Sequence, residues 1–168
     1  MVGLVFSSSC DSDDSHDGQL PPITTAGKGT FGCFVHGNVF LNEGLFGFGN
    51  GLYAELQVGA DVARVILYAG NYATKQNLIL SIKDTPTLQV GKIYDLQDSE
   101  IVQYIEYSAD QKCYYDVVLT GTMELLKFEV SNPQNRIISG KFEFTASSVD
   151  CQSTVVITEG RFDTNDVQ

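Results

Sequence analysis

Apolar and polar side chains alternate along the C-terminal part of the chain, from Asn135 to Asp163. One set of alternate positions holds Ile138, Gly140, Phe142, Phe144 and Ala146, and the set between them holds Ser139, Lys141, Glu143 and Thr145. A period of two is typical of a strand that buries one face. The pattern stops at residues 147–150 and resumes at residues 155–157, so it predicts two strands joined by a polar turn. Gly160 predicts a bulge or a close backbone approach late in the second strand.

Similar patterns recur upstream at short intervals. They predict strands over residues 30–35, 39–41, 52–58, 63–69, 78–83, 91–96, 101–107 and 113–119. The composition of residues 121–130 favours a helix, but the alternation of Leu126, Phe128 and Val130 favours a strand, which we predict. About ten strands, with turns every eight to twelve residues or so, predict an all-β fold: an antiparallel β-sandwich or a barrel-like sheet.

The first two predicted strands are separated by His36, Gly37 and Asn38. Glycine and asparagine tolerate positive φ, so these residues predict a tight hairpin turn. His36 is the one histidine in the predicted domain, and we interpret it as a solvated turn residue. A Ser-His-acid or Cys-His nucleophile needs a histidine or another base beside it. The sequence therefore offers no candidate catalytic residue of this type.

Four carboxylates lie close together in the sequence, at Asp95, Asp98, Glu100 and Glu106. Paired carboxylates can act as acid and base. In a chain with 21 acidic residues, however, such pairs arise by chance and usually face water. The glycine-rich residues 43–51 lack the Gly-Lys-Ser/Thr end of a phosphate-binding loop, and they lead into a strand. We therefore expect no enzyme activity and no cofactor.

The composition limits the possible partners. A chain of 168 residues with 43% apolar content is typical of one domain, which we place at residues 24–168. The formal charge of −11 argues against binding to nucleic acid, because that affinity comes from Lys and Arg on phosphates. The same charge disfavours docking of a basic patch on anionic lipid, so we expect membrane attachment only through a lipid anchor or a partner.

The N-terminal residues suggest such an anchor. The apolar residues 1–6 are followed by three serines and Cys10, and small residues before a cysteine are typical of the end of a bacterial lipoprotein signal. In such signals the cysteine thiol takes a diacylglycerol, so we predict lipidation of Cys10. The alternative is an ordinary disordered N-terminus with an incidental cysteine. The following acidic residues stay solvated through mutual repulsion, so residues 1–23 are predicted to be a signal and an acidic tether. A calcium loop starting at Asp11 would need glycine and a carboxylate at the positions of His16 and Pro22, so no metal site is predicted.

Three groups of residues carry a family resemblance: Thr30-Phe31-Gly32-Cys33, Gly91-Lys92-Ile93-Tyr94, and residues 138–146 together with 157–163. Together they resemble a family of uncharacterised Bacteroidetes lipoproteins known only as a domain of unknown function. The resemblance covers most of the predicted domain and rests mainly on structural residues. It implies a lipid-anchored protein at the bacterial outer membrane or cell surface. It carries over no activity, substrate or catalytic residue.

The cysteines of the predicted domain are Cys33, Cys113 and Cys151. Outside the reducing cytosol, a small β domain gains stability from a cross-link. A disulfide between Cys33, in the first predicted strand, and Cys151, at the start of the last, would tie the two ends of the sheet and leave Cys113 as a free thiol. The alternative is three buried free cysteines, which behave as small apolar groups.

The remaining candidate site is a group of tyrosines, Tyr104, Tyr107, Tyr114 and Tyr115, on two adjacent predicted strands. Rings on a rigid sheet can stack on sugars or accept peptide side chains, so the predicted partner is an extracellular glycan, a peptide or an envelope protein. Equally, they can be ordinary half-buried strand residues, in which case the protein is a structural module of the cell envelope. An alternative function is a lipocalin-like barrel that binds a small apolar ligand, with a mouth lined by Phe31, Phe34, Phe46 and Phe48.

Overall fold

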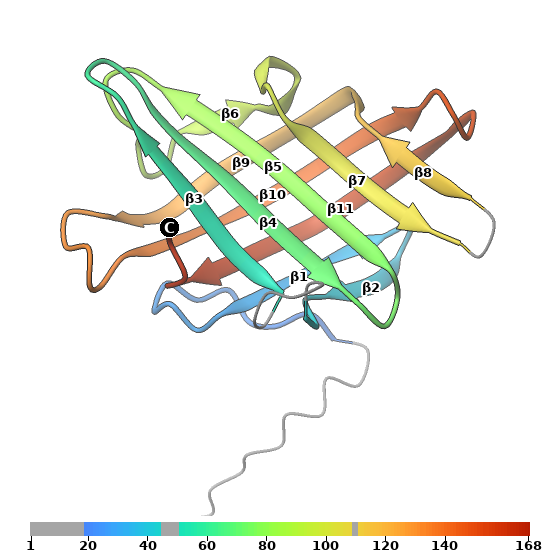
Figure 1. The fold of residues 1–168 in the computed structure, drawn as a ribbon, viewed down its shortest axis with the longest axis horizontal. Coiled ribbons are helices and arrows are strands. Elements are labelled where there is room, and N and C mark those ends of the chain that lie inside the picture. Colours follow the sequence, from blue (N-terminus) through green and yellow to red (C-terminus); the bar gives the residue numbers. More distant parts are fainter. Residues whose placement is uncertain (1–18, 45–50, 109–110) are drawn as a thin grey trace, which may run out of the picture.

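The computed structural model describes residues 19–44, 51–108 and 111–168 (Figure 1). Cys10, Phe46 and Phe48 lie outside the described residues. The described part contains eleven strands and one 3-10 turn, η1. These elements are β1 Thr30–Val35, β2 Asn38–Leu41, β3 Leu52–Val58, β4 Ala63–Asn71, β5 Gln76–Asp84, β6 Ile93–Asp95, η1 Leu96–Asp98, β7 Val102–Tyr107, β8 Lys112–Tyr115, β9 Val117–Glu129, β10 Ile137–Ser148 and β11 Ser153–Thr164. Among these residues there is no apolar helix of membrane-spanning length.

The strands form two antiparallel sheets that pack face to face (Figure 1). The six-stranded sheet has the order β2-β1-β11-β10-β9-β6, and the five-stranded sheet has the order β3-β4-β5-β7-β8. The predicted all-β fold is therefore confirmed, in its β-sandwich form.

Side chains from the inner faces of both sheets fill the space between them. Phe31 of β1 lies at its centre, with its ring centroid 5.4 Å from that of Phe40 and 5.6 Å from that of Phe142. Phe31 is only 1% exposed, so it is a core residue and does not line the mouth of a barrel. Burial of this apolar surface is the main force that holds the two sheets together.

The C-terminal hairpin forms as its alternating pattern predicts, with the apolar set of β10 facing the core. The predicted irregularity at Gly160 is confirmed, because the β10–β11 register shifts between Phe142 and Phe144. The ring of Phe142 lies against the Gly160 backbone, so a Cβ added at Gly160 would be 2.4 Å from the ring. Glycine is needed here for this close approach.

Two details of the predicted strands are corrected. The β1–β2 turn forms, but the residues with positive φ are His36 (50°) and Gly37 (80°), and Asn38 already belongs to β2. The predicted strand over residues 113–119 is two strands, because the chain leaves the five-stranded sheet after β8 and enters the six-stranded sheet at β9. Asp116 is the residue between them. Residues 121–129 are strand, as predicted.

The predicted disulfide between Cys33 and Cys151 is wrong. Cys151 is bonded to Cys113, and Cys33 is a free thiol, buried in the core. The sheet register explains the error: Cys33 pairs with Phe40 and lies beside the middle of β11, whereas Cys151 lies in the turn before β11 begins. Burial raises the pKa of the Cys33 thiol, which stays protonated as a small apolar group.

The first described residues are fastened to the six-stranded sheet by Asp163 of β11. Its carboxylate accepts hydrogen bonds from the Thr24 hydroxyl (2.6 Å) and from the backbone N–H groups of Ala26 (3.0 Å), Gly27 (2.8 Å) and Lys28 (3.2 Å). Desolvation of the buried Asp163 opposes ionisation, but these donors outweigh it and lower the pKa of the carboxyl group. The chain is therefore held against β11 just after the predicted tether.

Candidate functional site

The four candidate tyrosines divide into two pairs with opposite orientations. Tyr104 and Tyr115 are register partners on β7 and β8 that face the core, with 0% and 6% exposure and ring centroids 5.8 Å apart. The Tyr104 hydroxyl donates to Glu106 Oε1 (2.7 Å) and accepts from Gln76 Nε2 (2.6 Å). Burial, reinforced by the Glu106 carboxylate, raises the pKa of Tyr104. Neither ring offers a face to a ligand, so the ligand-binding prediction is wrong for these two residues.

Tyr107 and Tyr114 lie on the other side of the same two strands and are partly exposed. The Lys112 ammonium lies between them, 4.8 Å from the Tyr107 ring centroid and 4.3 Å from that of Tyr114. Interactions with Tyr114 and Tyr107 raise the pKa of Lys112, so it is cationic over the whole physiological range. The lysine already covers part of both rings, which leaves less ring surface for stacking on a sugar.

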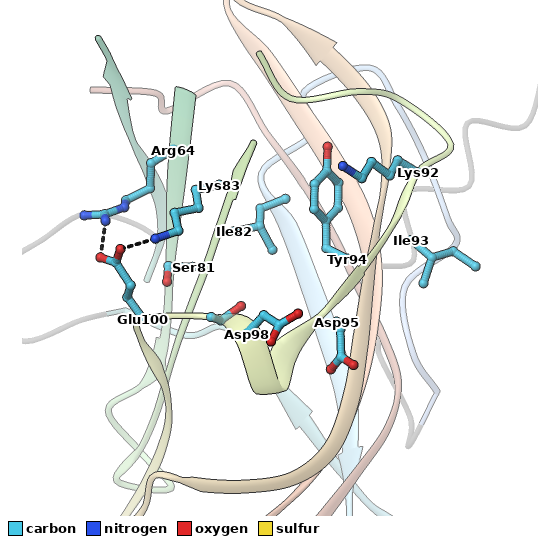
Figure 2. A pocket seen from close by; sticks show the side chains of 11 residues that line it. Arg64, Ser81, Ile82, Lys83, Lys92, Ile93, Tyr94, Asp95, Asp98 and Glu100 are labelled. Carbon is cyan, nitrogen blue, oxygen red and sulfur yellow. Dashed lines mark hydrogen bonds and ion pairs between the residues drawn. The ribbon is translucent and has the colours of Figure 1, made fainter. Parts of the chain in front are cut away.

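A cleft of about 330 Å³ lies elsewhere, between β5 and β6 beside η1 (Figure 2). Its lining combines three cations with three carboxylates and two serines: Arg64, Lys83, Lys92, Asp95, Asp98, Glu100, Ser81 and Ser99, together with Ile82, Ile93 and Tyr94. Charged groups from segments far apart in the sequence thus meet at one open concavity. Clefts with a few convergent polar groups are the usual place for a ligand.

One wall of the cleft is a three-residue ion-pair network, at the left of Figure 2. Glu100 is paired with both Arg64 of β4 and Lys83 of β5, and its Oε1 lies 2.5 Å from Lys83 Nζ. The hydrogen bond from Lys83, with the charge of Arg64, lowers the pKa of Glu100. Glu100 therefore stays ionised and neutralises much of the positive charge on this wall.

The opposite wall is built on Tyr94 of β6. Its hydroxyl accepts from the Gln89 N–H (2.7 Å) and donates to Asp84 Oδ2 (3.3 Å). Lys92 lies over the ring, 5.1 Å from its centroid, and its Nζ is 2.6 Å from Asp84 Oδ2. The hydrogen bond from Lys92 lowers the pKa of Asp84. Lys92 is therefore neutralised too, by a carboxylate on the far strand.

The lower rim of the cleft carries Asp95, the residue before η1, and Asp98, the last residue of η1 (Figure 2). Asp95 caps the turn, since its Oδ1 accepts from the Gln97 N–H at 2.9 Å. The Gln97 side chain donates to the Leu119 carbonyl (2.8 Å) and fixes the turn against β9. Among the described residues, neither Asp95 nor Asp98 forms an ion pair, so the unpaired charge at this rim is negative.

The cleft meets β5 and β6 along their edges. The residues that line it are consecutive in each strand: 81–83 of β5, and Lys92 with all of β6. Because side chains of a strand alternate between two faces, consecutive residues line the same cleft only where the cleft meets the strand's edge. The β5–β7 register ends at Leu80, with one further main-chain bond from the Ser81 N–H to the Ile101 carbonyl, and within the described residues β6 pairs only with β9. The cleft therefore presents two strand edges, one from each sheet, in addition to its charged side chains.

Asp95, Asp98 and Glu100 are neighbours in the sequence, and the prediction for them is only that they face water. Arg64 and Lys83 could not be predicted from the sequence, because nothing in a single sequence places β4 and β5 beside residue 100. Ser81 Oγ accepts from the Ile101 N–H (3.0 Å) and has no histidine beside it. In the part of the chain that the structure describes, no three His, Cys, Asp or Glu side chains are arranged to hold a metal ion.

The protein is thus a two-sheet antiparallel β-sandwich with a charged cleft at one sheet edge. Residues 54–164 match a family described as a domain of unknown function, DUF6252, and since the match spans 111 of the 168 residues the chain belongs to this family. The matched segment includes every residue that lines the cleft. Neither the curated proteins nor the solved structures gave a significant match.

Proposed function

We propose that this protein is a non-catalytic binding module, tethered by a lipid on Cys10 to the outer membrane or cell surface of a bacterium, and that its ligand occupies the cleft between β5 and β6. The ligand class is an extracellular glycan, a peptide or an envelope protein. This proposal follows the resemblance to Bacteroidetes lipoproteins for the anchor and the geometry of the cleft for the binding site.

The observation that carries the proposal is the convergence of charged side chains from distant segments on one open cleft beside the edge of β6. The attachment of the chain's N-terminal part lies elsewhere on the sheet. Residues 24–28 are held by Asp163 on β11, next to β1, whereas the cleft lies at β6. In the six-stranded sheet, β6 and β2 are the two outermost strands, with β1 beside β2 (Figure 1). The attachment and the cleft therefore lie at different strands of this sheet, and Ile23 and Ile93 line one shallow hollow on it.

The chemistry of the cleft supports binding rather than bond cleavage. Glu100 and Asp84 have pKa values lowered by their cationic partners, whereas a general acid at neutral pH needs a raised one. Ser81 lacks a base that would activate its hydroxyl. The formal charge of −11 supports a partner that is not nucleic acid.

The test is a binding screen of the purified chain against a glycan array and a bead-displayed library of random heptapeptides. The blocking variant Asp98→Trp places a large ring at the rim, and Asp150→Trp makes the same change at an exposed turn outside the cleft. We expect wild type and Asp150→Trp to bind the same ligands, and Asp98→Trp to bind them at least about tenfold more weakly, about 1.4 kcal/mol.

A Tyr107→Ala/Tyr114→Ala variant tests the competing surface on β7 and β8. Both rings are partly exposed, so this variant keeps the core intact. Loss of binding in this variant with full binding by Asp98→Trp would move the site to the tyrosines. A wild-type protein that binds no member of either library would contradict the proposed function.

A further inference from the structure

The edge of β6 that faces the cleft has no partner strand in the described chain. β6 is the last strand of its sheet and pairs only with β9, through Ile93 with Glu124, Tyr94 with Met123 and Asp95 with Thr122. A three-residue strand spans about 10 Å, which is enough for a short segment of another chain to pair with it. Such pairing supplies affinity through main-chain hydrogen bonds.

The opposite situation is seen at β3, one of the two edge strands of the other sheet. There the C-terminal residues of the chain run along the edge: Ala54 N–H donates to the Asp166 carbonyl, and Gln168 N–H donates to the Ala54 carbonyl, both at 2.9 Å. The fold thus already covers one strand edge with an extended segment. The β6 edge offers the same type of main-chain surface without such a segment from the described residues.

The charges around β6 indicate which side chains a segment paired with this edge would carry. Glu100 pairs with both Arg64 and Lys83 and balances one of their two positive charges, and Asp84 balances Lys92, so this group of five residues keeps one net positive charge. Asp95 and Asp98 have no such partner among the described residues, and the whole chain has a formal charge of −11. A basic segment is therefore both attracted to the protein and matched to the rim of the cleft.

We propose that the cleft binds an extended basic polypeptide segment, which adds as a strand to the edge of β6. Ile93 and Asp95 are two positions apart, so they lie on the same face of β6, and Ile93 is 66% exposed. A paired strand places its own side chains at the same spacing. The segment therefore carries Lys or Arg beside Asp95 and a large apolar residue two positions away, beside Ile93. This inference rests on the proposed function, because it takes the cleft as the binding site.

The test begins with the heptapeptides selected by the purified chain from the random library. We expect them to be enriched in Lys or Arg two positions from a large apolar residue. A selected peptide is then synthesised in two forms, each with N-methyl groups on one set of alternate residues. Only one set of N–H groups points toward β6, so one form should bind about tenfold or more weakly, about 1.4 kcal/mol, and the other like the parent.

The variant Asp98→Asn tests the charge, with Asp150→Asn as the matched control at an exposed turn. We expect Asp98→Asn to bind the peptide at least about threefold more weakly and with a smaller dependence on salt, and Asp150→Asn to bind like wild type. Asp95 is left unchanged because it caps η1.

Three results would overturn the inference: selected peptides without basic residues, equal binding of both N-methylated forms and the parent, or selection of glycans alone. In each of them the proposed function stands as long as Asp98→Trp blocks the ligand that is found. Absence of any ligand would overturn the proposed function and this inference together.

Discussion

The disulfide partner of Cys113, in the edge strand β8, is Cys151, in the turn between β10 and β11, and their Cα atoms are 5.7 Å apart. β8 belongs to the five-stranded sheet, whereas β10 and β11 belong to the six-stranded sheet. The bond therefore joins the two sheets at one end of the sandwich. Ser153 and Tyr115 add a hydrogen bond of 3.2 Å between the same two regions.

This cross-link predicts a measurable loss of stability when it is removed. The sequence separation of its cysteines is 38 residues, for which loop closure is worth about 2–4 kcal/mol. We expect the free energy of unfolding of the Cys113→Ser/Cys151→Ser variant, measured by urea unfolding, to be lower by that amount. A reducing agent should destabilise wild type and Cys33→Ala alike but leave the double variant unchanged. A disulfide-linked peptide that contains Cys33 would contradict the assignment.

The contact between Phe142 and Gly160 predicts that a single methyl group is costly. A Cβ at position 160 would lie 2.4 Å from the Phe142 ring, so either the ring or the bulge has to move. We expect Gly160→Ala to lower the free energy of unfolding by about 1–3 kcal/mol. Gly59→Ala is the control, since its Cβ would meet Val62 at an ordinary 3.5 Å. Equal stabilities of the two variants in urea unfolding would show that the bulge is not constrained.

Asp163 predicts a dependence of stability on pH. Its pKa is lowered in the folded state, so its ionised form contributes stability above the unfolded pKa of about 3.9 and loses it as pH falls through the folded value. We expect Asp163→Asn to cost about 2 kcal/mol at pH 7, and the difference from wild type to shrink progressively below about pH 4. Asp61→Asn, at an exposed bend, is the matched control. A difference that stays constant down to pH 2 would rule out the carboxylate as the cause.

The proposed anchor predicts a lipid on Cys10. Native protein purified from membranes should begin at Cys10 and carry the mass of a diacylglycerol, measured by mass spectrometry of the intact chain. Cys10→Ser should release the protein from the membrane fraction without changing its unfolding transition. An unmodified native protein that begins at Met1 would contradict the anchor.

The parts of the fold that the sequence predicts well are those set by neighbours in the chain. The alternation around Phe142 and Phe144, the turn at Gly37 and the irregularity at Gly160 all reflect local geometry, and each is present in the structure. The existence of the strands could therefore be predicted from the period of two. The division at Asp116 could not be predicted, because both adjoining segments alternate and only the change of sheet separates them.

The candidate site was harder to predict from the sequence, for the same reason. Alternation does place Tyr104 and Tyr107 on opposite faces, but it does not say which face is covered by the second sheet. The cleft combines Arg64, Lys83 and Glu100, whose proximity depends on how β4, β5 and the turn after η1 meet. The pairing of Cys113 with Cys151 depends in the same way on contacts between sheets. Such non-local contacts leave no local signal in a single sequence.

The most direct test of cleft binding is a map of amide chemical shifts for the purified, isotope-labelled chain, titrated with the ligand that the screens select. Binding at the cleft predicts that the largest shifts fall on residues 81–84 and 92–100, with small shifts across β7, β8 and their connection. Largest shifts at Tyr107, Lys112 and Tyr114, or on the outer face of β10 and β11, would contradict it.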